Sequence, residues 1–370
     1  MIGVILLFSC HGAQVEKPLE HILYTSEDPA IRRVVDKIDQ YELQILYTQV
    51  DRFDGQIQLI DHEFGLNDSA FFYPASTVKL PIVVLVLEEI SQREDFSLAT
   101  RFYVEGDTIE TTVGKEIIKV FATSDNDAYN RLFEFLGQDA INERLTDKNI
   151  GPHRISHRLS IENADDITTR PLIVYLNDST TTHMGPVVNA PLVHLKLKNI
   201  EKGTGFMAED ELIEEPFDFS LKNYYPVSAQ QEIMKRLFYP ELYRSKESFD
   251  LGQEELTLLL DAMSSPPRKW GYDEAEYYDS YGKFFIYGDT RSRIPESVRV
   301  YNKVGYAYGT MTDCAYVKDI GNNIEFILTA TLLVNQDGVF NDDQYEYESI
   351  GIPFLAALGR EIHNYELKRK

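Results

Sequence analysis

Cysteine is almost absent from this chain: Cys10 and Cys314 are the only two among 370 residues. Because Cys10 lies in an apolar N-terminal segment, we expect no internal disulfide, and we interpret Cys314 as a small buried apolar residue. Basic residues are also scarce, with 36 Lys and Arg against 60 Asp and Glu and a net charge of -24. The negative electrostatic field of such a chain repels phosphate backbones, which argues against nucleic acid as a partner.

Long apolar runs and glycine-rich phosphate loops are missing as well. Beyond residue 10 the most apolar stretch, residues 80–87, is too short to cross a bilayer. No phosphate-binding loop is present. His153 and His157 are spaced i, i+4, but no clear third metal ligand lies near them. We therefore expect neither a metal nor another cofactor.

The first ten residues, MIGVILLFSC, form an apolar segment that ends in Cys10. This length is typical of the apolar part of a secretion signal, and LFSC resembles the lipobox of bacterial lipoproteins, although no Lys or Arg precedes it. We expect residues 1–10 to be a signal with lipidation at Cys10, and residues 11–28 to be a polar tether. The expected location is therefore outside the bacterial cytoplasm, either periplasmic or anchored to the membrane by this lipid alone.

Hydrophobic periodicity predicts an α+β fold. It indicates a helix over residues 29–41, a β-hairpin over 43–64 with its turn at Asp54-Gly55, and a helix from Ser76 to about residue 92. Two helices flank residues 124–126, and Gly137 is the expected C-terminal stop of the second. Strands over 298–305, 310–319 and 324–334 precede a last helix over 348–365. Residues 150–297 are irregular, with helices at 229–238 and 254–264.

These elements suggest two lobes with a ligand cleft between them. Early and late strands would form one antiparallel sheet, flanked by the terminal helices, in a lobe of residues 29–75 and 298–370. Residues 76–297 would form an all-helical lobe with an enlarged middle region.

Ser76 and Lys79 stand at the entrance to the apolar helix, in the sequence PASTVKLPI. Residues i and i+3 share a helix face, so the amine can reach the hydroxyl. A lysine in apolar surroundings has a lowered pKa and can act as a base, which makes this pair a workable activated nucleophile. Taken alone the pattern is weak, because a serine often simply caps a helix. A second copy occurs at Ser280 and Lys283, which we attribute to chance.

Two further motifs favour the interpretation of Ser76 and Lys79 as a catalytic pair. Ser124-Asp125-Asn126 lies at a turn between helices, and Lys303-Val304-Gly305 lies on a late strand. With S-x-x-K, S-D-N and K-x-G in this order, the sequence resembles the penicillin-recognising serine hydrolases, most closely the class A β-lactamases. The resemblance covers nearly the whole chain from about residue 30 and is loose across residues 150–297.

The resemblance implies a role for each of the motif residues that carry out chemistry. Ser76 attacks the carbonyl and becomes acylated, Lys79 accepts or relays its proton, and Ser124 passes a proton to the leaving nitrogen. Asp125 is expected to be structural, holding the turn by hydrogen bonds.

The resemblance also implies which residues bind the substrate. Asn126 orients the substrate amide, and Lys303 supplies positive charge for the substrate carboxylate and for Ser124. The oxyanion would lie between the backbone N–H groups of Ser76 and Tyr306, next to Gly305. One departure is Val304, where the family has a hydroxyl residue. Valine cannot donate to a carboxylate, so recognition of that group is weakened.

The deacylating glutamate is the second departure. Glu162, in HRLSIENADD, lies in roughly the right place, but the expected E-x-x-L-N motif is absent. Glu162 is therefore either the base or a solvated loop carboxylate. Without the base, the acyl-enzyme would turn over slowly, as it does in penicillin-binding peptidases.

The sequence thus predicts a β-lactamase-like serine hydrolase that cleaves a β-lactam or related amide through a Ser76 acyl-enzyme. Two alternatives stay open: a peptidoglycan D-Ala-D-Ala peptidase, and a catalytically silent cell-envelope binding protein. The expected partner is a small-molecule or peptidoglycan-like substrate, and the chain is expected to be a monomer. The many tyrosines of residues 272–308 either line a groove or serve in ordinary packing.

Overall fold

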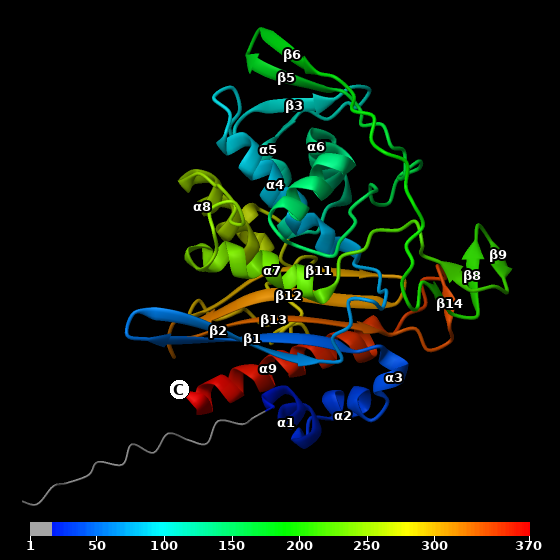
Figure 1. Cartoon of the computed structure of the whole chain (residues 1–370), viewed down its shortest axis with the longest axis vertical. Coiled ribbons are helices and arrows are strands. Elements are labelled where there is room, and N and C mark those ends of the chain that lie inside the picture. Colours follow the sequence, from blue (N-terminus) through cyan, green and yellow to red (C-terminus); the bar gives the residue numbers. More distant parts are fainter. Residues whose placement is uncertain (1–16) are drawn as a thin grey trace, which may run out of the picture.

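A five-stranded antiparallel sheet, with strand order β11-β12-β13-β1-β2, divides the molecule (Figure 1). The structure, a computed structural model, describes residues 17–370. Strands from the two ends of the chain meet at the centre, where Tyr47 pairs with Leu328. The predicted hairpin and the three predicted late strands are all present, as β1 (Gln44–Phe53), β2 (Gln56–Phe64), β11 (Val298–Ala307), β12 (Thr310–Asp319) and β13 (Ile324–Leu333).

Helices from the two ends of the chain cover one face of this sheet (Figure 1). They are α1 (Pro18–Thr25), α2 (Pro29–Val35), α3 (Ile38–Tyr41) and α9 (Ile352–Arg369). The expected tether over residues 11–28 is wrong for its second half, because Pro18–Thr25 forms α1. Leu19 and Leu23 of that helix are buried against the protein, so burial of this apolar face offsets the entropy of ordering the segment.

The other face carries the helical lobe, made of α4 (Lys79–Ser91), α5 (Val113–Ala122), α6 (Asn126–Asp147), α7 (Val227–Phe238) and α8 (Gln253–Ser264). Helix α4 is apolar on all sides because it runs through the centre of this lobe. Helix α6 is interrupted at Gly137, whose φ of 75° is left-handed, as expected for the glycine stop predicted there. Helix α7 lies directly on the sheet.

The prediction of an all-helical lobe over residues 76–297 is wrong, because strands β3 to β10 lie within that range. These short strands also make the middle of the chain more ordered than the predicted irregular region. A four-stranded sheet lies at the far end of the helical lobe, formed by β3 (Arg101–Val104), β4 (Thr111–Thr112), β5 (Leu172–Asn177) and β6 (Thr180–Met184). Two smaller sheets lie beside the main sheet, formed by β7 (Glu201–Lys202), β8 (Gly205–Ala208), β9 (Glu211–Ile213), β10 (Phe217–Asp218) and β14 (Val339–Phe340). Strands of two to six residues are too short to show alternation in a sequence.

The sheet has an apolar core on each face. On β13, Ile327 belongs to the core of the helical lobe, while Phe326 and Leu328 belong to the core beneath α9. Strand β11 is an edge strand, bonded only to β12. Its free side is therefore available to a ligand, and the predicted K-x-G motif lies on it.

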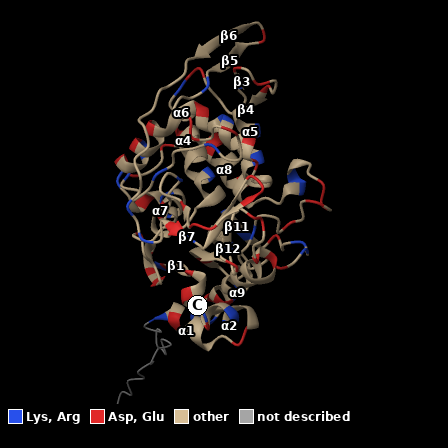
Figure 2. Cartoon of the chain, turned by 90° about the vertical axis from the view of Figure 1, so that its right-hand side faces the viewer, with Lys and Arg blue, Asp and Glu red and all other residues tan. Residues whose placement is uncertain are grey.

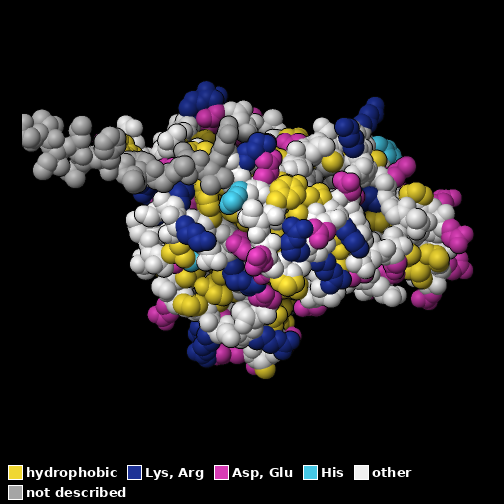
Figure 3. All heavy atoms as spheres, turned by 90° about the horizontal axis from the view of Figure 1, so that it is seen from below, with side chains coloured by type: hydrophobic (Ala, Val, Ile, Leu, Met, Phe, Trp, Pro, Cys, Tyr) yellow, Lys and Arg dark blue, Asp and Glu magenta, His cyan; other side chains and the backbone are white. Residues whose placement is uncertain are grey.

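Charged side chains of both signs are interspersed over the surfaces drawn in Figures 2 and 3, the second of which views the side of the terminal helices. Within residues 17–370, no helix is long and apolar enough to cross a membrane. The predicted signal over residues 1–10 and its Cys10 lie outside the described residues. Cys314 is buried, as expected, and its sulfur accepts a hydrogen bond from Thr329.

Candidate active site

Ser76 lies in a short 3₁₀ turn, Ala75–Val78, that leads into α4. The preceding residue, Ala75, has a φ of 47°, a region that costs a non-glycine residue energy and persists only where the surroundings enforce it. Ser76 is partly exposed at the mouth of the cleft. Its hydroxyl is therefore presented to a ligand from the start of a helix, where unpaired N–H groups favour developing negative charge.

Lys79 lies one turn further on and is fully buried. Its Nζ donates to Asn126 Oδ1 at 2.6 Å and to the carbonyl oxygen of Ser124. Burial lowers the pKa of Lys79 from its ordinary value to about 7, and the charge of Asp125 opposes that shift. A substantial fraction of this amine is therefore neutral near neutral pH, as a general base requires.

The S-D-N motif forms the turn between α5 and α6. Ser124 has a φ of 56°, so this turn is another point of backbone strain beside the site. Asp125 caps α6 by accepting the N–H of Ala128 at 2.8 Å, which agrees with its expected structural role. Asn126 donates through Nδ2 to Ser160 Oγ at 2.9 Å, which orients its amide toward Lys79.

Lys303 reaches the same turn from β11. Its Nζ donates to Ser124 Oγ at 2.8 Å and to the carbonyl oxygen of Val304 at 2.8 Å. Burial lowers its pKa well below the ordinary value, and the nearby charge of Lys79 lowers it further. The Ser124 hydroxyl thus lies between two lysines, because Lys79 Nζ is 3.4 Å from the same oxygen. This arrangement can move a proton through Ser124.

Gly305 lets β11 approach the nucleophile. A Cβ at this position would lie 2.7 Å from the carbonyl oxygen of Pro74 and 2.8 Å from the backbone nitrogens of Ser76 and Thr77. No residue with a side chain fits this space. The K-x-G glycine is therefore required by close packing of the strand against the start of the nucleophile's helix.

The backbone of Tyr306 points its N–H into the cleft. Only Tyr308 and Gly309, both with positive φ, separate Ala307 from its partner Thr310. In such a two-residue hairpin the flanking pair is hydrogen-bonded and the next pair, Tyr306 with Met311, is not. The N–H groups of Tyr306 and Ser76 therefore border the same side of the cleft, as an oxyanion hole requires.

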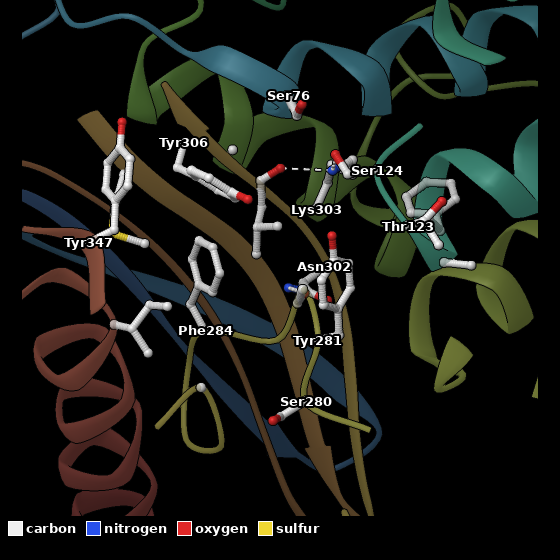
Figure 4. Close-up of a pocket in the computed structure, with 18 of the residues that line it drawn as sticks. Ser76, Thr123, Ser124, Ser280, Tyr281, Phe284, Asn302, Lys303, Tyr306 and Tyr347 are labelled. Atoms are coloured by element: carbon white, nitrogen blue, oxygen red, sulfur yellow. Dashed lines mark hydrogen bonds between the residues drawn. The ribbon is translucent and has the colours of Figure 1, made fainter. Parts of the chain in front are cut away.

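The motif residues line one crevice (Figure 4). A cavity of about 430 Å³ is lined by Ser76, Ser124, Asn126, Lys303, Gly305 and Tyr306, while the Lys79 side chain is bonded to Ser124 and Asn126 behind its wall. A second cavity of about 500 Å³ shares Ser76, Asn126 and Tyr306 with the first. The three motifs, far apart in the sequence, thus converge on the junction of the two cavities.

Glu162 is exposed and is not among the residues that line either cavity. Its role as a deacylating base therefore stays a prediction from the sequence. His153 and His157 do not converge: His153 Nε2 contacts the carbonyl oxygen of Asn142, whereas His157 Nδ1 contacts that of Arg158.

Other cavity residues were missed in the sequence. Ser160, the partner of Asn126, has no motif of its own. Tyr345 and Tyr347 line both cavities although they lie outside the tyrosine-rich stretch. Within that stretch, Tyr278, Tyr281 and Tyr306 do line the first cavity. Only the fold could reveal these neighbours, because the segments are distant in sequence.

Comparison with known proteins agrees with this fold. The model of the family described as "Beta-lactamase enzyme family" matches residues 29–184. A class A β-lactamase from Bacteroides cellulosilyticus has a similar structure, with a TM-score of 0.55 at 12% identity over 95% of this chain and 98% of that chain. The Streptomyces albus G β-lactamase gives 0.51 at 13% identity, over 91% and 98% of the two chains.

The protein named PBP-A is also similar, with a TM-score of 0.53 at 12% identity over 95% of this chain and 99% of that chain. No curated protein sequence matches. The fold is therefore that of the class A β-lactamases and related transpeptidases. The family match, together with this fold, confirms the resemblance of the chain to the β-lactamase-like, penicillin-recognising serine hydrolases.

Proposed function

We propose that this protein is a serine hydrolase that cleaves a β-lactam or a related amide through an acyl-enzyme on Ser76. The convergence of Ser76, Lys79, Ser124 and Lys303 on one crevice is the observation that carries this proposal. A nucleophile, a base with a lowered pKa and a hydroxyl that relays protons are the three groups that acyl transfer needs.

In the proposed acylation, Ser76 Oγ attacks the substrate carbonyl while neutral Lys79 takes the hydroxyl proton. The carbonyl oxygen becomes an oxyanion, which the N–H groups of Ser76 and Tyr306 stabilise. When the C–N bond breaks, Ser124 donates its proton to the leaving nitrogen and recovers one from Lys79. Lys303, bonded to Ser124 Oγ at 2.8 Å, orients that hydroxyl. Asn126 holds the amide of the acyl group.

A second candidate function is a peptidase that forms the same acyl-enzyme and releases it slowly. The observation that favours it is the exposure of Glu162 outside both cavities, because efficient deacylation needs a base within reach of the attacking water. A peptidoglycan D-Ala-D-Ala peptidase would behave in this way.

A peptidoglycan-like substrate would lie in the bacterial cell envelope, which supports an exported protein. We propose that it is exported and anchored by a lipid on Cys10, with no other contact to the membrane, and that it acts as a monomer. Globomycin treatment of producing cells tests the anchor, because blocked processing of a lipoprotein leaves a larger precursor.

A chromogenic cephalosporin, followed by absorbance and by intact mass, separates the alternatives. Rapid turnover identifies a β-lactamase, and a stable adduct that is lost in Ser76→Ala identifies the slow acyl-enzyme of a peptidase. If the parent protein neither turns over nor forms an adduct, and Ser76→Ala behaves identically, the chain is the catalytically silent binding protein.

A further inference from the structure

The first cavity continues past Lys303 into a compartment with largely apolar walls (Figure 4). Its lining extends from Lys303 and Val304 on β11 to Met311 on β12 and to Ile352 at the start of α9. We call this part the edge chamber and define it by the lining residues Tyr281, Phe284, Val304, Met311, Tyr347 and Ile352. Four of these six side chains are hydrocarbon or thioether, and the other two are tyrosines. Such walls favour an apolar or aromatic group.

Val304 lies where the related enzymes carry the hydroxyl residue of their K-T-G motif. Its side chain is buried, belongs to the apolar core beneath the sheet and leaves only a methyl surface toward the chamber. Gly282 lies opposite, since a Cβ built on it would be 3.8 Å from Val304 Cγ2. The wall beside Lys303 is therefore apolar on the strand side, and the loop at Gly282 faces it without a side chain.

Unengaged positive charge is also scarce around the chamber. Among the described residues that line this cavity, Lys303 is the only basic one and Glu348 the only acidic one. Lys79 and Lys283 lie behind the lining, where their amines are already bonded to Asn126 and to Asn302. The Lys303 amine already donates to Ser124 Oγ and to the Val304 carbonyl. Glu348 is exposed at the rim, where its carboxylate would repel an anion. A substrate carboxylate would thus lose its water without gaining a hydroxyl or a free cation.

We propose that the edge chamber binds the leaving-group half of the substrate, and that this half is a neutral apolar or aromatic group in place of a carboxylate. Ser124 and Lys303 line the approach to the chamber, and Ser124 is the residue proposed to protonate the leaving atom. The proposal rests on the proposed function, because it names the substrate class of the same Ser76 site, and it narrows that class to the related amides with a neutral leaving-group half. Penicillins, cephalosporins and D-Ala-D-Ala peptides all carry a carboxylate on this half, so they should acylate Ser76 more slowly than a neutral analogue does.

A matched pair of aryl esters tests this directly. Both carry the same phenylacetylglycyl acyl group. One leaves as phenol and the other as 3-hydroxybenzoate, so they differ only in a carboxylate on the leaving ring. Ser76 Oγ forms a new ester bond to the acyl carbon. The bond between that carbon and the aryloxy oxygen breaks, and the Ser76 proton leaves on this phenolic oxygen. Water then hydrolyses the acyl-enzyme and restores Ser76.

We expect the phenyl ester to have a kcat/KM about tenfold or more above that of its carboxylated partner, after correction for their hydroxide-catalysed rates. Val304→Thr restores a hydroxyl and should shift this ratio about tenfold toward the carboxylated ester. Tyr281→Ala should lower kcat/KM about tenfold for the phenyl ester while changing it little for the methyl ester of the same acyl group.

Tyr272→Ala is the matched control, because Tyr272 belongs to the same tyrosine-rich segment but is not among the residues that line the cavity. Tyr272→Ala should leave unchanged the ratio of kcat/KM for the phenyl ester to that for the carboxylated ester. It should also leave unchanged the ratio of kcat/KM for the phenyl ester to that for the methyl ester. Thermal melting of each variant confirms that it is folded before its rates are compared.

The outcomes separate the two proposals. If no ester acylates Ser76, the proposed function itself fails. If Ser76 is acylated but the carboxylated ester is the better substrate, or if Tyr281→Ala affects the phenyl and methyl esters equally, the edge chamber is not the leaving-group site and only this inference is overturned.

Discussion

The sequence contains two S-x-x-K motifs, and the structure gives them opposite surroundings. Ser76 and Lys79 lie at the start of a helix, while Ser280 and Lys283 lie in a loop beside β11. Both lysines are buried, and burial lowers the pKa of Lys79 to about 7 and that of Lys283 to about 8. Neither the pattern nor the pKa therefore distinguishes a catalytic pair from a structural one.

The hydrogen bonds make the distinction. Lys283 donates to the carbonyl oxygen of Met263 and, at 2.6 Å, to Asn302 Oδ1. Asn302 in turn donates at 2.8 Å to Asp313, which is buried beside Lys283. These contacts hold the loop against the sheet. The Ser280 hydroxyl donates a hydrogen bond to the carbonyl oxygen of Thr290. Lys79, in contrast, bonds to Ser124 and Asn126 of the S-D-N motif. Ser280 and Asn302 line the same cavity, but their hydrogen bonds run to Thr290, Gly282, Lys283 and Asp313 and not to that motif.

The largest expected effect comes from the two serines. Ser76→Ala should lower the rate of acylation by about a thousandfold or more, because it removes the attacking oxygen. Ser280→Ala should leave it within about twofold. Stopped-flow or steady-state hydrolysis of an activated ester measures both. Equal losses in the two variants would remove the distinction between the motifs.

The two lysines should separate activity from stability. Lys79→Met should slow acylation about a hundredfold or more, because it removes the base, while costing only about 1 kcal/mol of unfolding free energy, since water in the cavity can replace its bonds. Lys283→Met should cost about 3 kcal/mol, because it leaves the buried Asn302 Oδ1 and the Met263 carbonyl oxygen without their donor and removes a positive charge that favours the ionised form of Asp313. Urea unfolding and acylation rates of both variants are the measurements, and a reversed pattern would contradict the assignment.

The pH dependence of acylation should follow Lys79 and not Lys283. Only the neutral amine can accept the Ser76 proton, so the rate should rise with pH and level off above about 7. Below that pH it should fall about tenfold per unit, as the protonated fraction grows. Single-turnover acylation rates between pH 5 and 9 give this profile. A rate that falls as pH rises through 7 would exclude Lys79 as the base.

The smallest expected effect concerns Glu162. Because its carboxylate is exposed and outside the lining of both cavities, Glu162→Gln should change the deacylation rate by less than about twofold. Decay of the acyl-enzyme mass over time measures it. A stable adduct that appears only in this variant would show instead that Glu162 is the deacylating base.

Much of the fold was predictable because its signals are local. The hairpin at Asp54-Gly55 and the three late strands combine alternation with clear turn residues, and the structure confirms them. Gly137 likewise marks the break in α6. The tether prediction failed over Pro18–Thr25, where a short apolar face is buried by a helix from the other end of the chain.

The site was predictable to the extent that motifs carry it. Ser76, Ser124 and Lys303 were predicted from their sequence motifs, and the fold brings them together. Ser160 and Tyr347 could not be found in this way, because their places depend on contacts between segments far apart along the chain. The edge chamber was hidden for the same reason, since no single motif contains its walls.

The central claim is that Ser76 is the residue that becomes acylated. The most direct test is to incubate the protein with a penicillin, digest it and locate the added mass by tandem mass spectrometry. We expect one adduct, on the peptide that contains Ser76 and on the Ser76 oxygen itself. An adduct on Ser280 or on another residue, with Ser76 unmodified, would contradict it.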